Sequence, residues 1–347
     1  TLFRSLFTQY IVYQESGNIH LQLKEKGEIN TSLGPLFFGG KVVFSREGRL
    51  LSGELSKIQE IVTQAGRFPV SKVTFLEERL LYAVLARAQE VSLPWKKVRL
   101  ALGEIRFDRN GNIDQGILAG AEELNFFFGA IKVHRQFYFE PGAEGEMGHW
   151  RFELAQPQGI QTPLGKIEAR GLMGVFAEGA LAFITSTQIL SLNTPLGVIK
   201  TKADFLGFAP DGKLFSFHAA ESFVAPTALG KLRFQGHVVL YQGCELKSGY
   251  LGKPQNVNFQ GNTYPLGDYL MFYPSGKPMF ISLSRPARIK TSLGTFMSST
   301  TIDFYESGGI KELKLYNGER LGGRNFPPGA VLRLDEKGKI LVEQGGP

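Results

Sequence analysis

The feature that most constrains this chain is a tetrapeptide that returns along nearly its whole length. The clearest copies are Thr162–Gly165 and Thr194–Gly197, both Thr-Pro-Leu-Gly. Related copies are Thr31-Ser32-Leu33-Gly34, Thr227-Ala228-Leu229-Gly230, Tyr264-Pro265-Leu266-Gly267 and Thr291-Ser292-Leu293-Gly294. With weaker copies included, the marking glycines are 34, 66, 103, 129, 165, 197, 230, 267, 294 and 322, which are about 32 residues apart on average. Such a period predicts an array of about ten similar units.

A second turn signal lies between the tetrapeptides. In Ala209-Pro210-Asp211-Gly212, proline presets the φ angle of the first central turn position. Glycine takes the left-handed conformation that closes a short hairpin with a bulge. The same scheme fits Thr-Pro-Leu-Gly, whose leucine we expect to fold inward and cap the core. Gln242-Gly243 is expected to be another such turn, with Cys244 following it. Aromatic residues stand just before these turns and are expected to form a ladder along the sheet edge: Phe44, Phe75, Phe107, Phe176, Phe208, Tyr241, Tyr273 and Tyr305.

The segments between turns alternate polar and apolar residues. In residues 231–240, Lys, Arg, Gln and His occupy one face, and Leu, Phe, Val and Leu the other. A period of two with one polar face is typical of antiparallel sheet. The sequence therefore predicts an all-β fold with about ten repeats of roughly 32 residues. Its strands, about twenty in number and 10–13 residues long, form a long antiparallel β-meander. A sheet of this size must be coiled, folded over or closed on itself, since its apolar face cannot stay open to water.

Two stretches have helical features that compete with this pattern. Residues 52–62 and 77–90 carry apolar residues at helical spacing, and the second is rich in Ala, Arg and Glu. The repeat register places turns at 63–66 and 75–80 instead. We favour strands in both stretches, with a helix at 77–90 as the alternative.

No linker or change of composition interrupts the series. The sequence therefore predicts a single β-repeat domain spanning residues 1–347, with 1–30 and 323–347 as terminal caps. The chain begins at Thr1 rather than Met, which is compatible with a signal peptide removed before this residue.

Composition limits the chemistry. The net charge of +7 is compatible with an anionic partner such as a membrane surface or an acidic glycan. The charges are scattered and form no basic run, so no nucleic-acid partner is expected. The single cysteine, Cys244, rules out an intrachain disulfide and a multi-cysteine zinc site. No nucleophile elbow, phosphate loop or dinucleotide fingerprint is present, so we expect no catalytic residue, no metal and no cofactor.

Several turn-and-strand units resemble the variant MORN repeats of bacterial proteins, a β-hairpin family whose units read roughly aromatic-x-x-Gly-Lys. The matching segments are 272–277 (Phe-Tyr-Pro-Ser-Gly-Lys), 304–310 (Phe-Tyr-Glu-Ser-Gly-Gly-Ile) and 316–320 (Tyr-Asn-Gly-Glu-Arg). Units of this kind cover about a fifth of the chain, and these segments match best. The resemblance implies a binding or scaffold role at the cell envelope.

The pattern breaks at a glycine-rich excursion over residues 140–146. His134, Arg135, His149 and Trp150 flank it and would approach one another if the excursion closes a hairpin. These four residues are the candidate binding site.

The sequence thus predicts a non-catalytic structural or binding repeat protein of the bacterial cell envelope, periplasmic, at the cell surface or secreted, with an extended β-sheet surface. Its partner is expected to be a protein or an anionic glycan or lipid of the envelope, and membrane association is compatible with it. The alternatives are a lipid- or glycan-holding β-structure and an outer-membrane β-barrel.

Overall fold

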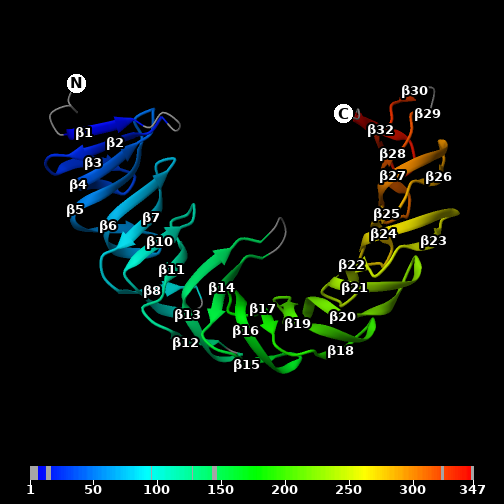
Figure 1. Cartoon of the computed structure of the whole chain (residues 1–347), viewed down its shortest axis with the longest axis horizontal. Coiled ribbons are helices and arrows are strands. Elements are labelled where there is room, and N and C mark those ends of the chain that lie inside the picture. The colour runs from blue at the N-terminus through cyan, green and yellow to red at the C-terminus, as the bar shows by residue number, and fades with distance from the viewer. Residues whose placement is uncertain are drawn as a thin grey trace. The chain divides into compact units, whose positions relative to one another are not determined.

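The structure is a computed structural model that describes residues 7–12, 17–94, 96–126, 128–142, 147–321 and 324–344, with side chains described from residue 17 to residue 341. Every regular element in these ranges is a β-strand (Figure 1). The predicted all-β antiparallel meander is therefore confirmed. None of the described residues belongs to a helix long and apolar enough to span a membrane.

The chain divides into two compact units, each built of consecutive antiparallel strands. Unit 1 contains residues 1–161 and 170–182, and unit 2 contains 162–169 and 183–347. The repeat continues through both units, and the single domain 1–347 stays a prediction.

The strands of unit 1 are β1 (Phe7–Val12), β2 (Ile19–Leu23), β3 (Gly27–Thr31), β4 (Gly34–Phe44), β5 (Leu50–Thr63), β6 (Gly66–Leu76), β7 (Arg79–Leu85), β8 (Gln89–Leu93), β9 (Lys96–Leu100), β10 (Gly103–Phe107), β11 (Ile113–Ile117), β12 (Glu122–Phe126), β13 (Gly129–Glu140), β14 (His149–Leu154) and β15 (Gln158–Thr162, whose last residue falls in unit 2). Two strands are divided between the units, β16 (Gly165–Phe176) and β17 (Leu181–Ser186). Unit 2 continues with β18 (Ser191–Thr194), β19 (Gly197–Phe208), β20 (Leu214–Thr227), β21 (Gly230–Leu240), β22 (Leu246–Leu251), β23 (Gln255–Phe259), β24 (Asn262–Phe272), β25 (Pro278–Leu283), β26 (Ala287–Thr291), β27 (Gly294–Phe304), β28 (Ile310–Leu315), β29 (Glu319–Leu321), β30 (Arg324–Phe326), β31 (Val331–Leu334) and β32 (Ile340–Gln344).

The tetrapeptide forms the tip of a hairpin, and its threonine holds the turn. In Thr162–Gly165, the Thr162 hydroxyl donates to the Gly165 carbonyl (2.8 Å) and accepts from the Leu164 amide (3.1 Å). The same two hydrogen bonds recur in the turns that begin at residues 31, 63, 194, 227 and 291. A side chain that bonds both ends of its own turn explains why threonine stands first.

The five-residue turns at the other end of each hairpin follow one pattern. In the turn that begins at Tyr273, its amide donates to the Lys277 carbonyl and the Gly276 amide donates to the Tyr273 carbonyl, both at 2.8 Å. The same two backbone hydrogen bonds recur in the turns that begin at residues 45, 108, 176, 209, 241, 305 and 335. Gly276 is left-handed, with φ +75°, and the strand register shifts by one residue beside it. The predicted bulged hairpin is thus confirmed.

Four details of the predicted turns are wrong. Tyr264–Gly267 lies inside β24, because the turn of that repeat is Gln260-Gly261, with φ +50° and +75°. Gly103 likewise begins β10, opposite Leu85, and marks no hairpin tip. The tip leucines do not all fold inward, since Leu164 is 40% exposed and Leu229 is buried. In the turn at 241–245 the left-handed residue is Cys244, with φ +68°, and not the glycine before it.

The two ambiguous stretches are strands, as the repeat register predicted. Residues 52–62 lie within β5, and 77–90 contain β7 and the start of β8. The turn between β6 and β7 is made by Glu77 and Glu78, both left-handed. Cross-strand pairing decides the conformation here against a local helical preference.

We call the two long arms of each hairpin its limbs. In most repeats one limb is interrupted and forms two short strands, so the described residues contain 32 strands rather than about twenty. Pro157 and Pro254 stand at such breaks, and proline supplies no amide hydrogen for a ladder. The glutamine that follows each proline bonds the backbone of the neighbouring strand through its side-chain amide. Gln158 bonds the amide and carbonyl of Lys132 (3.0 and 2.7 Å), and Gln255 does the same for Arg233 (both 3.2 Å).

In several repeats the hairpin folds back so that its tip meets the turn at the other end of the next repeat. The Ser32 hydroxyl donates to the Glu78 carbonyl (2.5 Å), and the Ser292 hydroxyl donates to the Gly338 carbonyl (3.3 Å); each contact joins residues 46 apart. The Ala228 amide donates to the Gly276 carbonyl (3.4 Å) in the same way. Among the predicted ways to bury the apolar face, these contacts support the folded-over sheet. We call this line of tip-to-turn contacts the seam.

The core lies between the folded limbs. Rings near a tip pack against rings next to a five-residue turn of the following repeat, as in Phe68–Phe107 (5.6 Å between centroids), Phe234–Phe272 (6.4 Å) and Tyr264–Phe304 (5.8 Å). All six side chains are at most 2% exposed. Burial of this many aromatic rings between neighbouring repeats holds one repeat to the next.

Candidate functional site

The candidate residues His134, Arg135, His149 and Trp150 lie on one hairpin. β13 and β14 pair with Glu140 opposite His149 and Val133 opposite Leu154. Residues 143–146 of the predicted excursion lie outside the described residues. The hairpin forms, but its register keeps the two halves of the candidate set apart.

His134 and Arg135 are exposed on β13, at the bulge that separates the pairs made by Val133 and Phe137. Glu140 lies six positions along the strand from His134, or roughly 20 Å at about 3.3 Å per residue. The Arg135 carbonyl accepts a hydrogen bond from the Leu118 amide (2.5 Å), which fixes the backbone here.

His149 belongs to a charged cluster at the open end of the hairpin. Its Nε2 lies 3.4 Å from Glu140 Oε2, and Arg151 donates to the same oxygen at 2.5 Å. The Arg151 guanidinium also lies over the Tyr138 ring, 5.4 Å from its centroid. Burial lowers the pKa of His149, and Arg151 lowers it further, while Glu140 acts in the opposite direction. The Arg151 guanidinium is thus already paired with a carboxylate and stacked on an aromatic ring.

Trp150 points to the opposite face of β14 and belongs to the core. It is 3% exposed, and its ring lies 5.7 Å from that of Phe137 and 5.3 Å from that of Phe139. A side chain this buried offers no face to a ligand. The four predicted residues therefore do not form one site. His149 and Trp150 are adjacent in β14 but point to opposite faces of the strand.

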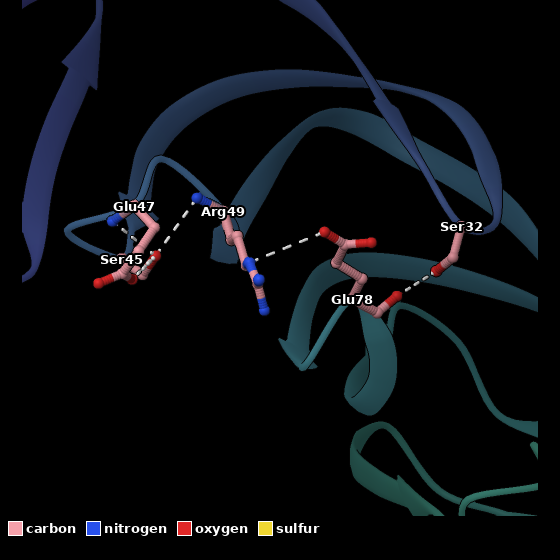
Figure 2. Close-up of polar contacts among 5 residues, drawn as sticks. All are labelled: Ser32, Ser45, Glu47, Arg49 and Glu78. Atoms are coloured by element: carbon pink, nitrogen blue, oxygen red, sulfur yellow. Dashed lines mark hydrogen bonds and ion pairs between the residues drawn. The ribbon is translucent and has the colours of Figure 1, made fainter.

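A groove opens along the seam of unit 1. It has a volume of about 520 Å³, and its wall includes Asn30, Ser32, Arg49 and Glu78. Figure 2 shows Glu78 between Arg49 and Ser32: its carboxylate lies 4.0 Å from Arg49 Nε, and its carbonyl accepts a hydrogen bond from the Ser32 hydroxyl.

The turn at 45–49 contributes Glu47, Gly48 and Arg49 to this groove wall. The Ser45 hydroxyl donates to Glu47 Oε2 (2.8 Å), and this bond is the main reason that the pKa of Glu47 is lowered. All the charged groups of the groove are well exposed, so their ion pairs contribute little to stability.

Two smaller grooves lie along the seam of unit 2. One, of about 200 Å³, lies beside Tyr264 and Ser292, and the other, of about 230 Å³, lies beside Pro226 and Cys244. Because the grooves recur where tips meet turns, they follow from the repeat.

The predicted aromatic ladder is present but divides into two rows. Phe44, Phe107 and Phe208 are buried in the core. The three tyrosines are half-buried and their hydroxyls donate to the backbone of the next repeat: Tyr241 to Phe272, Tyr273 to Phe304 and Tyr305 to Leu334, at 2.7–2.8 Å. This row ties repeats together.

Sequence reasoning missed a row of aromatic side chains on the outer face of unit 2. Tyr250 is 44% exposed and pairs directly with Tyr269 across β22 and β24, with ring centroids 4.9 Å apart. Phe280 on β25 follows, 6.1 Å from Tyr269. On β22, Lys247 Nζ lies 5.7 Å from the centroid of Phe215. The only signal in the sequence was that aromatic residues stand at strand positions where the alternation predicts polar ones.

A polar cluster on the same unit was also missed. His218 Nδ1 donates to Asp204 Oδ2 at 2.7 Å, and His218 faces His237 directly across β20 and β21, with ring centroids 5.1 Å apart. The hydrogen bond from His218 is the main cause that lowers the pKa of Asp204, and burial lowers the pKa of His237. Across the part of the chain that the structure describes, no group of three or more His, Cys, Asp or Glu side chains is placed to hold a metal ion.

No protein-family model matches the chain, and the comparison with characterised proteins gives no match. Among solved structures, the chain is similar to the crystal structure of TcdB2-TccC3 without its hypervariable C-terminal region, with a TM-score of 0.13 and 12% identity. The alignment covers 94% of this chain and only 17% of that one. A similarity of this size carries no argument about function.

Proposed function

We propose that this chain is a non-catalytic binding and scaffold protein of the bacterial cell envelope, which uses the outer face of its folded-over sheet to hold an anionic glycan. The observation that carries the proposal is the row of Tyr250, Tyr269 and Phe280, three aromatic side chains that face outward from neighbouring strands. Aromatic faces of this kind stack on flat apolar faces of ligands and add polar contact through their hydroxyls.

Charge favours an anionic partner over a neutral one. The chain carries a net charge of +7, and Lys247 lies on β22, the strand that also carries Tyr250. A glycan that bears carboxylates meets both requirements, since its rings can stack on tyrosines while its charge is attracted to the surface.

The folded limbs favour a surface site over an internal one. Side chains such as Phe38, Phe234 and Leu266 are fully buried between the limbs, and the seam joins the limbs at their ends. A packed interior of this kind gives no support to the alternative of a lipid held against the apolar face. The resemblance of 272–277 and 304–310 to variant MORN units agrees with a scaffold role.

Co-sedimentation of the untagged protein with purified peptidoglycan sacculi, an anionic glycan, tests the proposal at about 50 mM salt. We expect the wild type to sediment with the sacculi, and Tyr250→Ala and Tyr269→Ala each to weaken binding roughly tenfold, as loss of one stacking ring does elsewhere. Tyr316→Ala is the matched control, because Tyr316 is an exposed tyrosine outside the row.

Two results would count against the proposal. If wild-type protein stays in the supernatant, the glycan partner is wrong. If it sediments but both variants sediment equally well, the aromatic row is not the binding surface.

A further inference from the structure

We propose that His218 and His237 form a chelating site for a divalent transition-metal ion such as Cu²⁺, Ni²⁺ or Zn²⁺, with Asp204 as the positioning residue. The inference does not rest on the glycan surface proposed above, although the two sites adjoin, because Val238 pairs with Gly249 and this register places His237 next to Tyr250. It rests on the geometry of three neighbouring strands, β19, β20 and β21.

The two histidines are direct cross-strand partners on one face of the sheet. Side chains in this position have their Cβ atoms about 4.5–5.5 Å apart, close enough for both rings to reach one ion. Two imidazoles that bind the same ion at a metal–nitrogen distance of about 2.0–2.1 Å have ring centroids roughly 4.5–5 Å apart. The observed 5.1 Å is near this value, and the two ring planes lie at 80° to each other.

Asp204 fixes which nitrogen of His218 is available. Because His218 Nδ1 donates to the Asp204 carboxylate at 2.7 Å, the lone pair of that ring lies on Nε2. A carboxylate behind a histidine is the usual outer partner of a metal-binding imidazole, which it orients and makes more basic.

A β-bulge brings Asp204 to this position. The register between β19 and β20 shifts between Thr201 and Leu206, so that several residues of β19 lie opposite the segment that contains His218. Bulges re-aim side chains in this way and occur often beside functional sites.

The chemistry of the ligands selects the ion. Neutral imidazole favours copper, nickel and zinc over magnesium and calcium, and copper binds most tightly in this series. The protein supplies two nitrogen ligands, and water completes the coordination. Such a site is therefore weaker than a three- or four-ligand centre and remains open to exchange.

The test is calorimetric titration of the full chain, without a polyhistidine tag, with Cu²⁺ and with Zn²⁺. We expect one site for Cu²⁺, with affinity at least tenfold lower in His218→Ala and in His237→Ala. Asp204→Asn should lower affinity by roughly 10- to 100-fold while both ligands remain, since it removes only the outer partner. His134→Ala is the matched control, because His134 is an exposed strand histidine that lies on β13 in unit 1.

Electron paramagnetic resonance of the Cu²⁺-loaded wild type gives a second readout that needs no variant. Superhyperfine splitting from two imidazole nitrogens is expected. A spectrum with one or none, or equal affinity in wild type and both histidine variants, overturns the proposal.

Discussion

The turns that begin at Tyr241 and Tyr273 have the same hydrogen bonds but different residues at the strained position. In both, the tyrosine hydroxyl donates to a backbone carbonyl 31 residues further along the chain, at 2.7 Å. The left-handed position holds Gly276 in one turn, with φ +75°, and Cys244 in the other, with φ +68°. A residue with a Cβ atom adopts this conformation at a cost of roughly 1–2 kcal/mol. The turn is therefore set by the strands and by the contacts between repeats, and glycine only lowers its conformational cost.

The largest effect is expected where packing supports the Tyr273 turn. Phe272 stands just before this turn, is 1% exposed and packs against Phe234. Phe272→Ala leaves a large cavity, and we expect it to lower the free energy of unfolding by about 3–5 kcal/mol in urea titrations followed by circular dichroism. It should also speed amide hydrogen exchange in the Tyr273 turn more than in the Tyr241 turn.

Tyr316→Ala, at an exposed position, is the control for lost aromatic area. A loss below about 1.5 kcal/mol for Phe272→Ala would mean that packing does not hold the turn.

Gly276→Ala makes the Tyr273 turn resemble the Tyr241 turn. A Cβ atom added at Gly276 meets nothing within 4 Å. The substitution therefore changes only the free-energy cost of holding this residue in the left-handed conformation. We expect a loss of about 1–2 kcal/mol in the same urea titration. Ser275→Ala, one residue earlier in the turn, controls for a change of side chain without a positive φ. An unchanged midpoint would show that this turn does not need its glycine.

Removing the shared tyrosine hydroxyl tests whether both turns depend on contacts between repeats. Tyr241→Phe and Tyr273→Phe should each cost about 1 kcal/mol at pH 7, as loss of one hydrogen bond does. If only one of the two variants is destabilised, the turns are not held in the same way.

The tyrosine variants also carry a pH prediction. Burial is the main cause that raises the pKa of both hydroxyls above the ordinary value of 10.0. The folded state then binds more protons than the unfolded state above pH 10, so the stability from these groups is complete below pH 10 and falls as pH rises further. Urea midpoints at pH 7, 9, 10 and 11 should fall less steeply above pH 10 in the phenylalanine variants than in the wild type. Equal slopes would contradict the assigned cause.

The sequence predicted the features that depend on local chemistry. Turn glycines, strand alternation and the 32-residue period were all visible, because each follows from conformational preference or from one-sided burial. The tip at Gln260-Gly261 was missed because Tyr264–Gly267 matches the tetrapeptide more closely. Only the paired strands show that Phe259 faces Asn262 and so fix the turn between them.

Contacts between distant residues could not be predicted in this way. Counting outward from the tip at Thr227–Gly230 places His218 opposite residue 239, but the bulge between Ala219 and Phe223 moves its partner to His237. A shift of two residues decides whether a histidine pair exists at all. The seam depends likewise on contacts 46 residues apart. The candidate hairpin formed as expected, yet its register separated His134 from His149.

Cys244→Gly gives the Tyr241 turn the residue that its counterparts have, and is the smallest expected effect. Glycine relieves the left-handed strain but also makes the unfolded chain more flexible, so the two effects partly cancel. We expect a net gain of about 0.5–1 kcal/mol, measured as a higher urea midpoint with an unchanged slope. Cys244→Ala separates the causes, because it removes the thiol and keeps the Cβ atom, and it should give no gain. A gain in both variants would assign the effect to the thiol, and a loss in Cys244→Gly would mean that its side chain contributes packing in the seam groove that outweighs the strain.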